Sequence, residues 1–208
     1  MKQRYQWDGM YKDITDYVKT CYECQMRGGP KKNNPIRMIP PMDLFQRWGI
    51  DIVGPLPTTE DGNRYIVVAM DYFSRWPEAR PLRHANATSV ATFIYEEIIC
   101  RYGPPAVIQN DQGTHFINQV IEQLTKCFRI KHSISSAYHP QSNGLVERFN
   151  RTLCEGIAKV ADTVLDWDTL IQPILFAYRT KKLRITNATP YELVYGKNVT
   201  MPMDDHKI

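Results

Sequence analysis

Three acidic residues stand in settings that suit metal-binding carboxylates better than solvated surface groups. Asp51 lies inside the apolar run WGIDIVGPLP, and Asp111 follows a short apolar run that begins at Ala106. Glu147 lies near the start of an expected helix, after the polar stretch YHPQSNG. A charged group in an apolar segment is costly without a partner. Carboxylates that converge repel one another unless a cation shares their charge, so these three acids are candidate metal ligands.

The spacing of the acids and the residues around them carry a family resemblance. The pattern is D-x59-D-x35-E, with the third acid inside HPQSNGLVERFNRTL. It resembles the catalytic core of retroviral and gypsy-type retrotransposon integrases, which are polynucleotidyl transferases. The likeness continues through DYFSRWPEA, NDQGTHF and ATPYELVYGK, and it covers roughly residues 7–196. It implies a ribonuclease H-like α/β fold, in which two adjacent strands and a flanking helix bring the three acids together.

The chemistry implied by this resemblance is metal-assisted phosphoryl transfer on DNA. Oxygen ligands with no cysteine or histidine beside them favour Mg²⁺ or Mn²⁺ over zinc. Two ions, bridged by Asp51 and completed by Asp111 and Glu147, would suit in-line displacement at phosphorus. The reaction would be 3′-end processing followed by strand transfer into target DNA. Cys154 has no histidine beside it and is not expected to act as a nucleophile.

The elements that must position the acids are predicted from hydrophobic periodicity and turn residues. We expect a hairpin of strands over 47–55 and 65–70, a third strand over 76–82, a fourth that ends at Asp111 and a fifth over 129–134. Asp71, beyond the second strand, is expected to be structural. Helices are expected over 88–102, after a cap at Thr114, around Glu147, and over 166–181 with a bend at Pro173. Together they predict a mixed five-stranded sheet flanked by helices.

The side chains expected inside the core follow from the same patterns. Helical spacing predicts four inward residues on each of three helices: Val90, Phe93, Ile94 and Ile98; Val120, Ile121, Leu124 and Phe128; and Phe149, Leu153, Ile157 and Val160. Trp48, Phe73 and Trp76 are also expected in the core.

Residues 1–27 are predicted to be part of a small helical zinc module. Met10, Ile14, Tyr17 and Val18 fall on one helical face, and Cys21 and Cys24 form a C-x2-C pair. A structural zinc site needs four ligands, and the resemblance implies two histidines upstream. The first histidine of the sequence is His84, so Cys21 and Cys24 are interpreted as two free thiols of an incomplete module, with a partial zinc site as the alternative. Residues 28–41 are rich in Gly, Pro, Asn and Lys and are predicted to be a linker, followed by the core over 42–200 and a tail over 201–208.

Several polar residues near Glu147 are candidate DNA contacts. Asn150 and Arg151, one turn along the helix, could hold phosphate. A basic cluster of Arg179, Lys181, Lys182 and Arg184 is either a backbone contact or a solvated helix end. The loop residues that could touch DNA ends, with turn formation as the alternative, are Tyr138, His139, Gln141 and Asn143.

Composition limits the class of protein but does not decide the function. The 208 residues suffice for one domain and an appendage, and no apolar run is long enough for a membrane span. The net charge of +4 lies within residues 1–41, so the rest of the chain is neutral and gives no bulk signal for DNA binding. No secretion signal opens the sequence, and a chromosomal DNA substrate implies the nucleus. The expected partners are DNA and further copies of the chain.

Two alternatives to an active integrase remain open at this point. A ribonuclease H-like nuclease that only hydrolyses is disfavoured by the integrase-like segment HPQSNGLVERFN. A non-catalytic DNA- or protein-binding module of the same fold is suggested by the missing zinc histidines and by the end of the sequence at Ile208. All three acids are present at the expected spacing, which favours catalysis.

Overall fold

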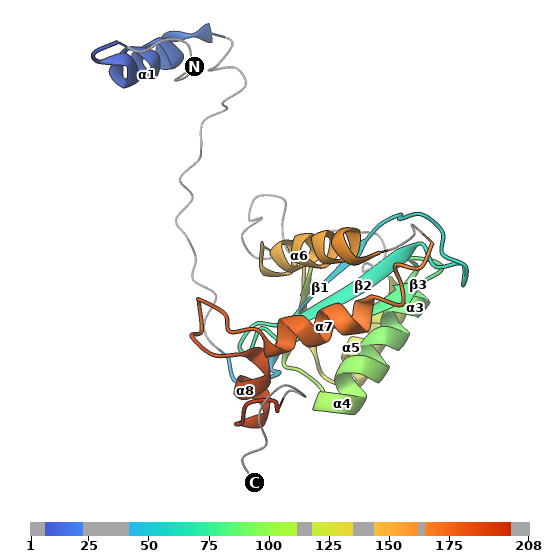
Figure 1. Ribbon diagram of the computed structural model, residues 1–208. Coiled ribbons are helices and arrows are strands. Elements are labelled where there is room, and N and C mark those ends of the chain that lie inside the picture. Colours follow the sequence, from blue (N-terminus) through green and yellow to red (C-terminus); the bar gives the residue numbers. More distant parts are fainter. Residues whose placement is uncertain (1–6, 23–41, 112–117, 135–143, 162–164, 201–208) are drawn as a thin grey trace. The chain divides into compact units, whose positions relative to one another are not determined.

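The computed structural model describes residues 7–22, 42–111, 118–134, 144–161 and 165–200. The chain divides into two compact units, residues 1–39 and 40–208 (Figure 1). None of the described helices has the length and apolar character needed to cross a lipid bilayer.

In the first unit, helix α1 (Met10–Thr20) begins after Gly9, whose φ of 84° is readily adopted only by glycine. The Trp7 indole donates a hydrogen bond of 2.8 Å to the Asp13 carboxylate. Of the four residues expected on one helical face, Met10 is buried, whereas Tyr17 and Val18 are exposed. Periodicity gives the direction of an apolar face, whereas its burial requires a second element against it.

The second unit is built on a mixed five-stranded sheet in the order β3-β2-β1-β4-β5. β1 pairs antiparallel with β2 and β2 with β3, whereas β1 with β4 and β4 with β5 are parallel. The predicted hairpin and all five strands are confirmed. Their bounds are β1 Arg47–Val53, β2 Tyr65–Asp71, β3 Pro77–Leu82, β4 Val107–Asn110 and β5 Lys131–Ile134.

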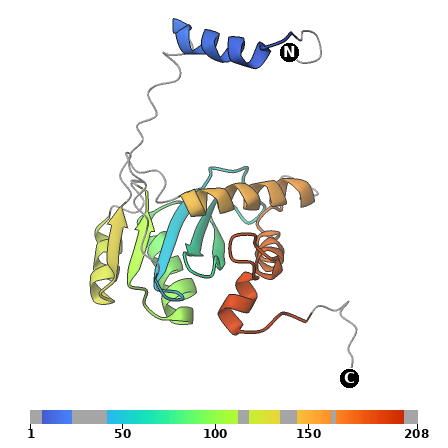
Figure 2. The ribbon, with the colours of Figure 1, turned by 90° about the vertical axis from the view of Figure 1, so that its left-hand side faces the viewer.

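Helices cover both faces of this sheet, as Figures 1 and 2 show. On one face, α3 (Ala87–Phe93) continues through a π-helical segment, η1 (Ile94–Ile99), into α4 (Cys100–Tyr102). It packs beside α5 (Gln119–Cys127). The other face carries α6 (Gly144–Val160) and α7 (Ile171–Thr180), followed by the short α8 (Pro190–Tyr195).

Alternation along the central strands divides the core into two layers. Val67 and Ala69 of β2 pack with Trp48 and Ile50 of β1 against the α3 side. The intervening residues of β2, with Ile66 as the first, pack against α6 and α7. Since neighbouring residues of a strand point to opposite faces, Asp51 projects from β1 on the α6 side.

Some predicted details of the second unit are wrong. The caps are Asn86 and Asn118, whose side chains accept from Ser89 N and Val120 N, so α5 begins after Thr114. α7 starts at Ile171, which places Pro173 in its first turn, where proline needs no bend. The side chains predicted inside but found exposed are Phe73, Val120 and Val160.

Candidate active site

Asp51 lies in the central strand and is held by two hydrogen bonds. Its Oδ1 accepts from the Ile52 backbone N–H at 2.8 Å, and its Oδ2 accepts from the Asn150 side-chain amide at 2.7 Å. The residue is half-buried. Its carboxylate therefore has a fixed orientation on the face of the sheet that α6 covers.

The ionisation of Asp51 reports on the two other acids. Burial raises the pKa of Asp51 from 3.8 to about 6, and the negative charges of Asp111 and Glu147 add to this rise. The hydrogen bonds from Ile52 and Asn150 act in the opposite direction. The three predicted acids therefore lie within electrostatic reach of one another, although 60 and 36 positions separate them in the sequence.

Asp111 follows β4, the parallel neighbour of β1. Gln109 of β4 pairs with Gly49, so β4 runs beside the strand that carries Asp51. The residue before Asp111 is fixed: Asn110 is fully buried, and its Oδ1 lies 2.5 Å from His132 Nε2 on β5. The Asp111 side chain itself is exposed. A buried strand end thus presents this carboxylate at the surface.

Glu147 lies in the first turn of α6 and is exposed, whereas Val146 and Phe149 on the same helix are buried. Val146 and Phe149 pack against the sheet. A Cβ atom on Gly49 of β1 would lie 2.6 Å from Val146 Cγ2 and 2.9 Å from Tyr72 Cε2. The lack of a side chain at Gly49 therefore lets α6 approach β1 closely enough to bring Glu147 toward Asp51.

The donor set fits a hard divalent cation. Carboxylate oxygens are ligands that Mg²⁺ and Mn²⁺ prefer, and Asn150 Oδ1 is buried without a hydrogen-bond partner. That oxygen could accept a hydrogen bond from a donor that a bound ion brings into the site. Within the described residues, no three Asp, Glu, His or Cys side chains are close enough to hold an ion as they stand. Asp51, Asp111 and Glu147 would have to come closer together to hold one ion.

The predicted DNA contacts have different positions. Asn150 bonds to Asp51, so its amide positions an acid, which the sequence pattern did not reveal. Arg151 is exposed on α6. Tyr138, His139, Gln141 and Asn143 lie outside the described residues.

The cysteines of the sequence are not arranged for catalysis or for a complete metal site in the described part of the chain. Cys21 caps the C-terminal end of α1 and is half-buried, whereas Cys24 lies outside the described residues. Burial raises the pKa of Cys154, which disfavours the thiolate needed for attack. This agrees with the expectation that Cys154 is not a nucleophile.

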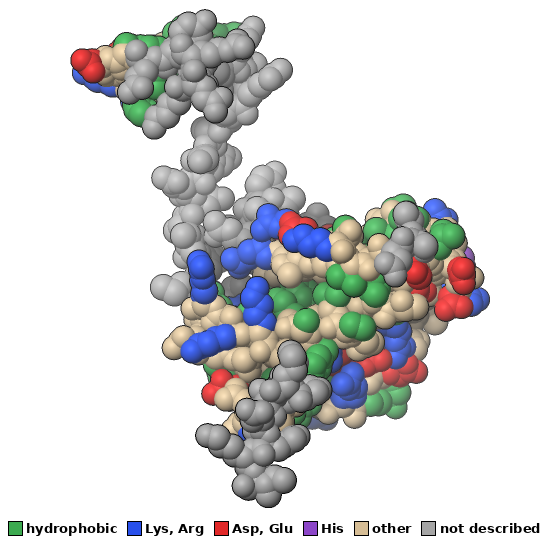
Figure 3. All heavy atoms as spheres, viewed as in Figure 1, with side chains coloured by type: hydrophobic (Ala, Val, Ile, Leu, Met, Phe, Trp, Pro, Cys, Tyr) green, Lys and Arg blue, Asp and Glu red, His purple; other side chains and the backbone are tan. Residues whose placement is uncertain are grey.

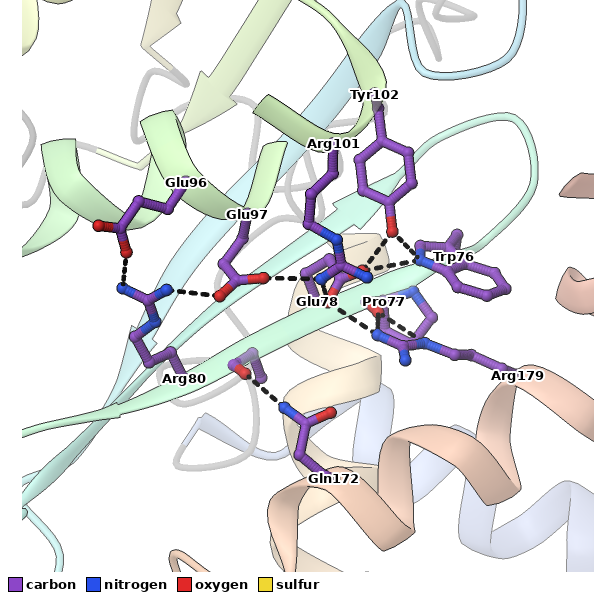
Figure 4. A network of polar contacts seen from close by, with 11 residues as sticks. Trp76, Pro77, Glu78, Arg80, Glu96, Glu97, Arg101, Tyr102, Gln172 and Arg179 are labelled. Carbon is purple, nitrogen blue, oxygen red and sulfur yellow. Dashed lines mark hydrogen bonds and ion pairs between the residues drawn. The ribbon is translucent and has the colours of Figure 1, made fainter. Parts of the chain in front are cut away.

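Arg179 does not belong to an exposed basic cluster. Its guanidinium donates to the Pro77 carbonyl at 2.7 Å, pairs with Glu78 at 2.8 Å and lies over the Trp76 ring (Figure 4). The alternative that Arg179 contacts a DNA backbone is therefore wrong. Its partners lie about a hundred positions earlier in the sequence, where helical spacing gives no signal. Lys181, Lys182 and Arg184 are exposed, as predicted.

Asp71 has the structural role that the sequence predicts. It is fully buried, and its Oδ2 accepts from the backbone N–H and the hydroxyl of Ser74, both at 2.7 Å. Its Oδ1 accepts from Phe45 N at 3.1 Å. Asp71 thereby closes the turn between β2 and β3. It is thus fully occupied by bonds to the protein.

A mixed sheet with helices on both faces and acids on two adjacent strands and a helix defines the ribonuclease H-like class of polynucleotidyl transferases. A family model described as "Integrase core domain" matches residues 44–140, and one described as "Integrase zinc binding domain" matches residues 1–30. The chain belongs to the integrases of retroviruses and retrotransposons, a family whose cores depend on divalent metal ions.

Relatives and solved structures agree with this assignment. The chain resembles the "Retrovirus-related Pol polyprotein from transposon 412" of Drosophila melanogaster with 35% identity. The match covers the whole of this chain and 17% of the polyprotein. It resembles the "Pol polyprotein" of Feline endogenous virus ECE1 with 41% identity. That match covers 72% of this chain and 14% of the polyprotein. It thus spans less than a fifth of these relatives.

Among solved structures, the catalytic core domain of BIV integrase matches with a TM-score of 0.58 and 29% identity, over 71% of this chain and 92% of that one. A second match is a chain from the simian T-cell lymphotropic virus intasome in complex with PP2A regulatory subunit B56 gamma. It has a TM-score of 0.65 and 21% identity, and it covers 91% of this chain and 68% of that one. The second likeness concerns the fold alone.

Proposed function

We propose that this chain catalyses DNA integration: 3′-end processing of element DNA and strand transfer into target DNA. One observation carries the proposal. The carboxylate of Asp51 lies within electrostatic reach of Asp111 and Glu147, on two adjacent strands and the helix packed across them. Such a set is suited to phosphoryl transfer because it can hold the cations that the reaction requires.

The cations proposed for this site are two Mg²⁺ or Mn²⁺ ions, which Asp51, Asp111 and Glu147 would hold. When bound, such ions activate the attacking oxygen and stabilise the leaving oxygen of a phosphodiester. The residues of the chain orient this chemistry. Ile52 N–H and the Asn150 amide fix the Asp51 carboxylate and favour its ionised form.

In each of the two steps, one bond to phosphorus forms and one breaks, so no further cofactor is needed. In processing, a water oxygen forms a bond to phosphorus and the bond to the 3′ oxygen of the preceding nucleotide breaks. In strand transfer, the freed 3′ hydroxyl forms a bond to a target phosphorus and one target phosphodiester bond breaks. The number of phosphodiester bonds is conserved in this second step, so no ATP is consumed.

The proposed partners are the element ends, the target DNA and further copies of the chain, acting in the nucleus. Arg151 and the loop residues Tyr138, His139, Gln141 and Asn143 are proposed DNA contacts. Cys21 and Cys24 would be zinc ligands only if residues absent from this sequence completed the site.

The test is strand transfer by the purified chain on a pre-processed or branched DNA substrate with Mn²⁺. Joined products are expected for the wild type and none for Asp111→Asn. Folding of both proteins is checked by thermal unfolding, and DNA binding by fluorescence anisotropy. A folded wild type that binds DNA but gives no product on either substrate would contradict the proposal for this chain.

A further inference from the structure

Three arginines line one pocket between the N-terminal end of α6 and the C-terminal end of α7. The pocket has a volume of about 260 Å³. Figure 3 shows Lys and Arg side chains gathered at the left of the view, over these two helix ends. The lining residues that carry the argument are Arg75, Arg148 and Arg184, with Thr152 and Tyr178 beside them.

No described carboxylate forms an ion pair with the arginines of this pocket, although the buried Asp71 carboxylate attracts Arg75 from a longer distance. Arg80, Arg101 and Arg179 all pair with carboxylates, whereas no described carboxylate lies in an ion pair with Arg75, Arg148 or Arg184. Arg148 is close enough to disfavour the charge of Arg75: burial lowers the pKa of Arg75 and Arg148 lowers it further, whereas Tyr178 and Asp71 act in the opposite direction.

One donor in the pocket is buried with no acceptor. The Nε atom of Arg75 is inaccessible to solvent and has no hydrogen-bond partner. An unsatisfied buried donor is unfavourable, and more so when the group is charged. A ligand oxygen at the accessible ends of the guanidinium groups would offset the repulsion between the arginines.

The backbone holds Arg75 in place for such a ligand. Arg75 has a φ of 63°, in the left-handed region that non-glycine residues rarely adopt. Its N–H donates to the Asp71 carbonyl at 3.1 Å, in the turn that the buried Asp71 carboxylate closes. Arg148 is oriented through its side chain. Its Nε donates to the Gly144 carbonyl at 2.8 Å, which leaves the end of the guanidinium available. Strained, positioned side chains of this kind are typical of ligand sites.

The pocket lies near Glu147, one of the three acids. Arg148 follows Glu147 on α6, and both Glu147 and Arg75 influence the ionisation of the half-buried Tyr72. The planar donor groups of arginine match the oxygens of phosphate. We propose that Arg75, Arg148 and Arg184 bind a backbone phosphate of the DNA strand held at the acids. The source of the phosphate rests on the proposed function, whereas the anion site itself does not.

The first arm of the test measures duplex DNA binding by fluorescence anisotropy over a series of salt concentrations. Arg148→Gln and Arg184→Gln are used because these residues lie on accessible helix and loop positions, and Lys159→Gln, exposed in the last turn of α6, is the charge-matched control. Each arginine variant is expected to bind about tenfold more weakly and to reduce the slope of log K against log salt by about 0.9. The Lys159 variant should lose clearly less of both.

The same arm locates the phosphate. Single methylphosphonate substitutions along one strand remove one charge at a time. One position should weaken binding by the wild type and have no effect on Arg148→Gln. If every position affects both proteins equally, or if the arginine variants bind like Lys159→Gln, the assignment to a DNA phosphate is overturned.

The second arm tests the anion site without DNA or catalysis. Inorganic phosphate is titrated while the arginine Nε–H resonances are followed by NMR, with Arg75→Lys used to assign the Arg75 signal. Saturable movement of that resonance, lost in Arg184→Gln, is expected. A signal that does not move would overturn the site, even if strand transfer succeeds. If strand transfer fails while this resonance responds, the anion site stands and the proposed function alone is refuted.

Discussion

The side-chain amide of Asn150 donates to the Asp51 carboxylate across 2.7 Å, which joins α6 to the central strand of the sheet. Asn150 lies one helical turn after Glu147, so the same helix both presents one acid and orients another. Its bond to Asp51 also opposes the rise in the pKa of that group caused by burial and by the other two acids. Asn150 is thus a positioning residue for the carboxylate that the mechanism needs ionised.

We predict that Asn150→Ala shifts the acid limb of the pH profile to higher pH. The hydrogen bond lowers the pKa of Asp51, so its loss should move this limb up by about one pH unit. Strand transfer near pH 6.5 should fall about threefold and recover at pH 8. Arg151→Ala, the exposed neighbour, is the control and should keep the wild-type profile shape. Equal loss of rate at every pH would contradict the positioning role.

We predict that Asp51→Asn stabilises the metal-free protein. An acid whose pKa is about 6 when folded and 3.8 when unfolded favours the protonated native state. The fold therefore loses stability as the pH rises from about 4 to 6, and the penalty is complete above that range. Allowing for solvent screening, it amounts to about 2 kcal/mol at pH 7.5.

Thermal unfolding at several pH values with EDTA or Mn²⁺ checks this prediction. Without metal, the two proteins should converge in stability below pH 4 and separate above pH 6, with Asp51→Asn the more stable. Mn²⁺ should raise the Tm of the wild type and have little effect on the variant. A wild type that is more stable than Asp51→Asn in EDTA at pH 7.5 would refute the assigned sign.

The positions of the acids could be predicted from the sequence because each depends on local pattern. Asp51 and Asp111 lie in or after apolar runs, and runs of this kind form the central strands. The face of the sheet on which Asp51 lies follows from alternation once the strand is known. The partner of Asp51 could not be predicted, because Asn150 is distant in sequence and its i+3 spacing from Glu147 fits several roles.

The wrong burial predictions have a common physical cause. Helical periodicity gives the centre of an apolar face but not its width, so Val120 and Val160 at the margins are exposed. Phe73 lies in the β2–β3 turn, where no periodicity applies. Arg179 turns inward because its partner Glu78 is fixed on β3, a tertiary relation that charge counting along α7 does not detect.

We predict that Gly49→Ala displaces α6 and reduces both stability and activity. The new Cβ would overlap Val146 Cγ2, which packs against the sheet one residue before Glu147. Overpacking of this kind costs about 1–3 kcal/mol. Urea unfolding measures the loss of stability, and strand transfer by the folded protein measures the displacement of Glu147.

Two variants sharpen this experiment. Gly144→Ala is the control for stability, because a Cβ there would have no neighbour within 4 Å and should change the free energy of unfolding by less than about 0.5 kcal/mol. In the Gly49→Ala/Val146→Ala double variant, the overlapping methyl group is removed. Its destabilisation should be smaller than the sum of the single effects, and strict additivity would show that Gly49 is not in steric contact with α6.

The last prediction concerns Glu78, which joins the helices on both sides of the edge strand β3. Its carboxylate is 2% exposed and accepts from Trp76 Nε1 at 2.9 Å and from the Tyr102 hydroxyl of α4 at 2.5 Å. It also pairs with Arg179 of α7 at 2.8 Å and with Arg101 at 3.2 Å (Figure 4). Removing one partner of a buried pair leaves the other charge uncompensated, so Glu78→Ala and Arg179→Met should each cost about 3–5 kcal/mol in urea unfolding. Arg101→Met should cost less than about 1 kcal/mol, because the Arg101 side chain is 43% exposed.

The Glu78→Ala/Arg179→Met double variant should be less destabilised than the sum of the two single variants, since both charges are then gone. If Arg101→Met proves as damaging as Arg179→Met, the exposed arginine would be the principal partner of Glu78, and the link between β3 and α7 would be secondary.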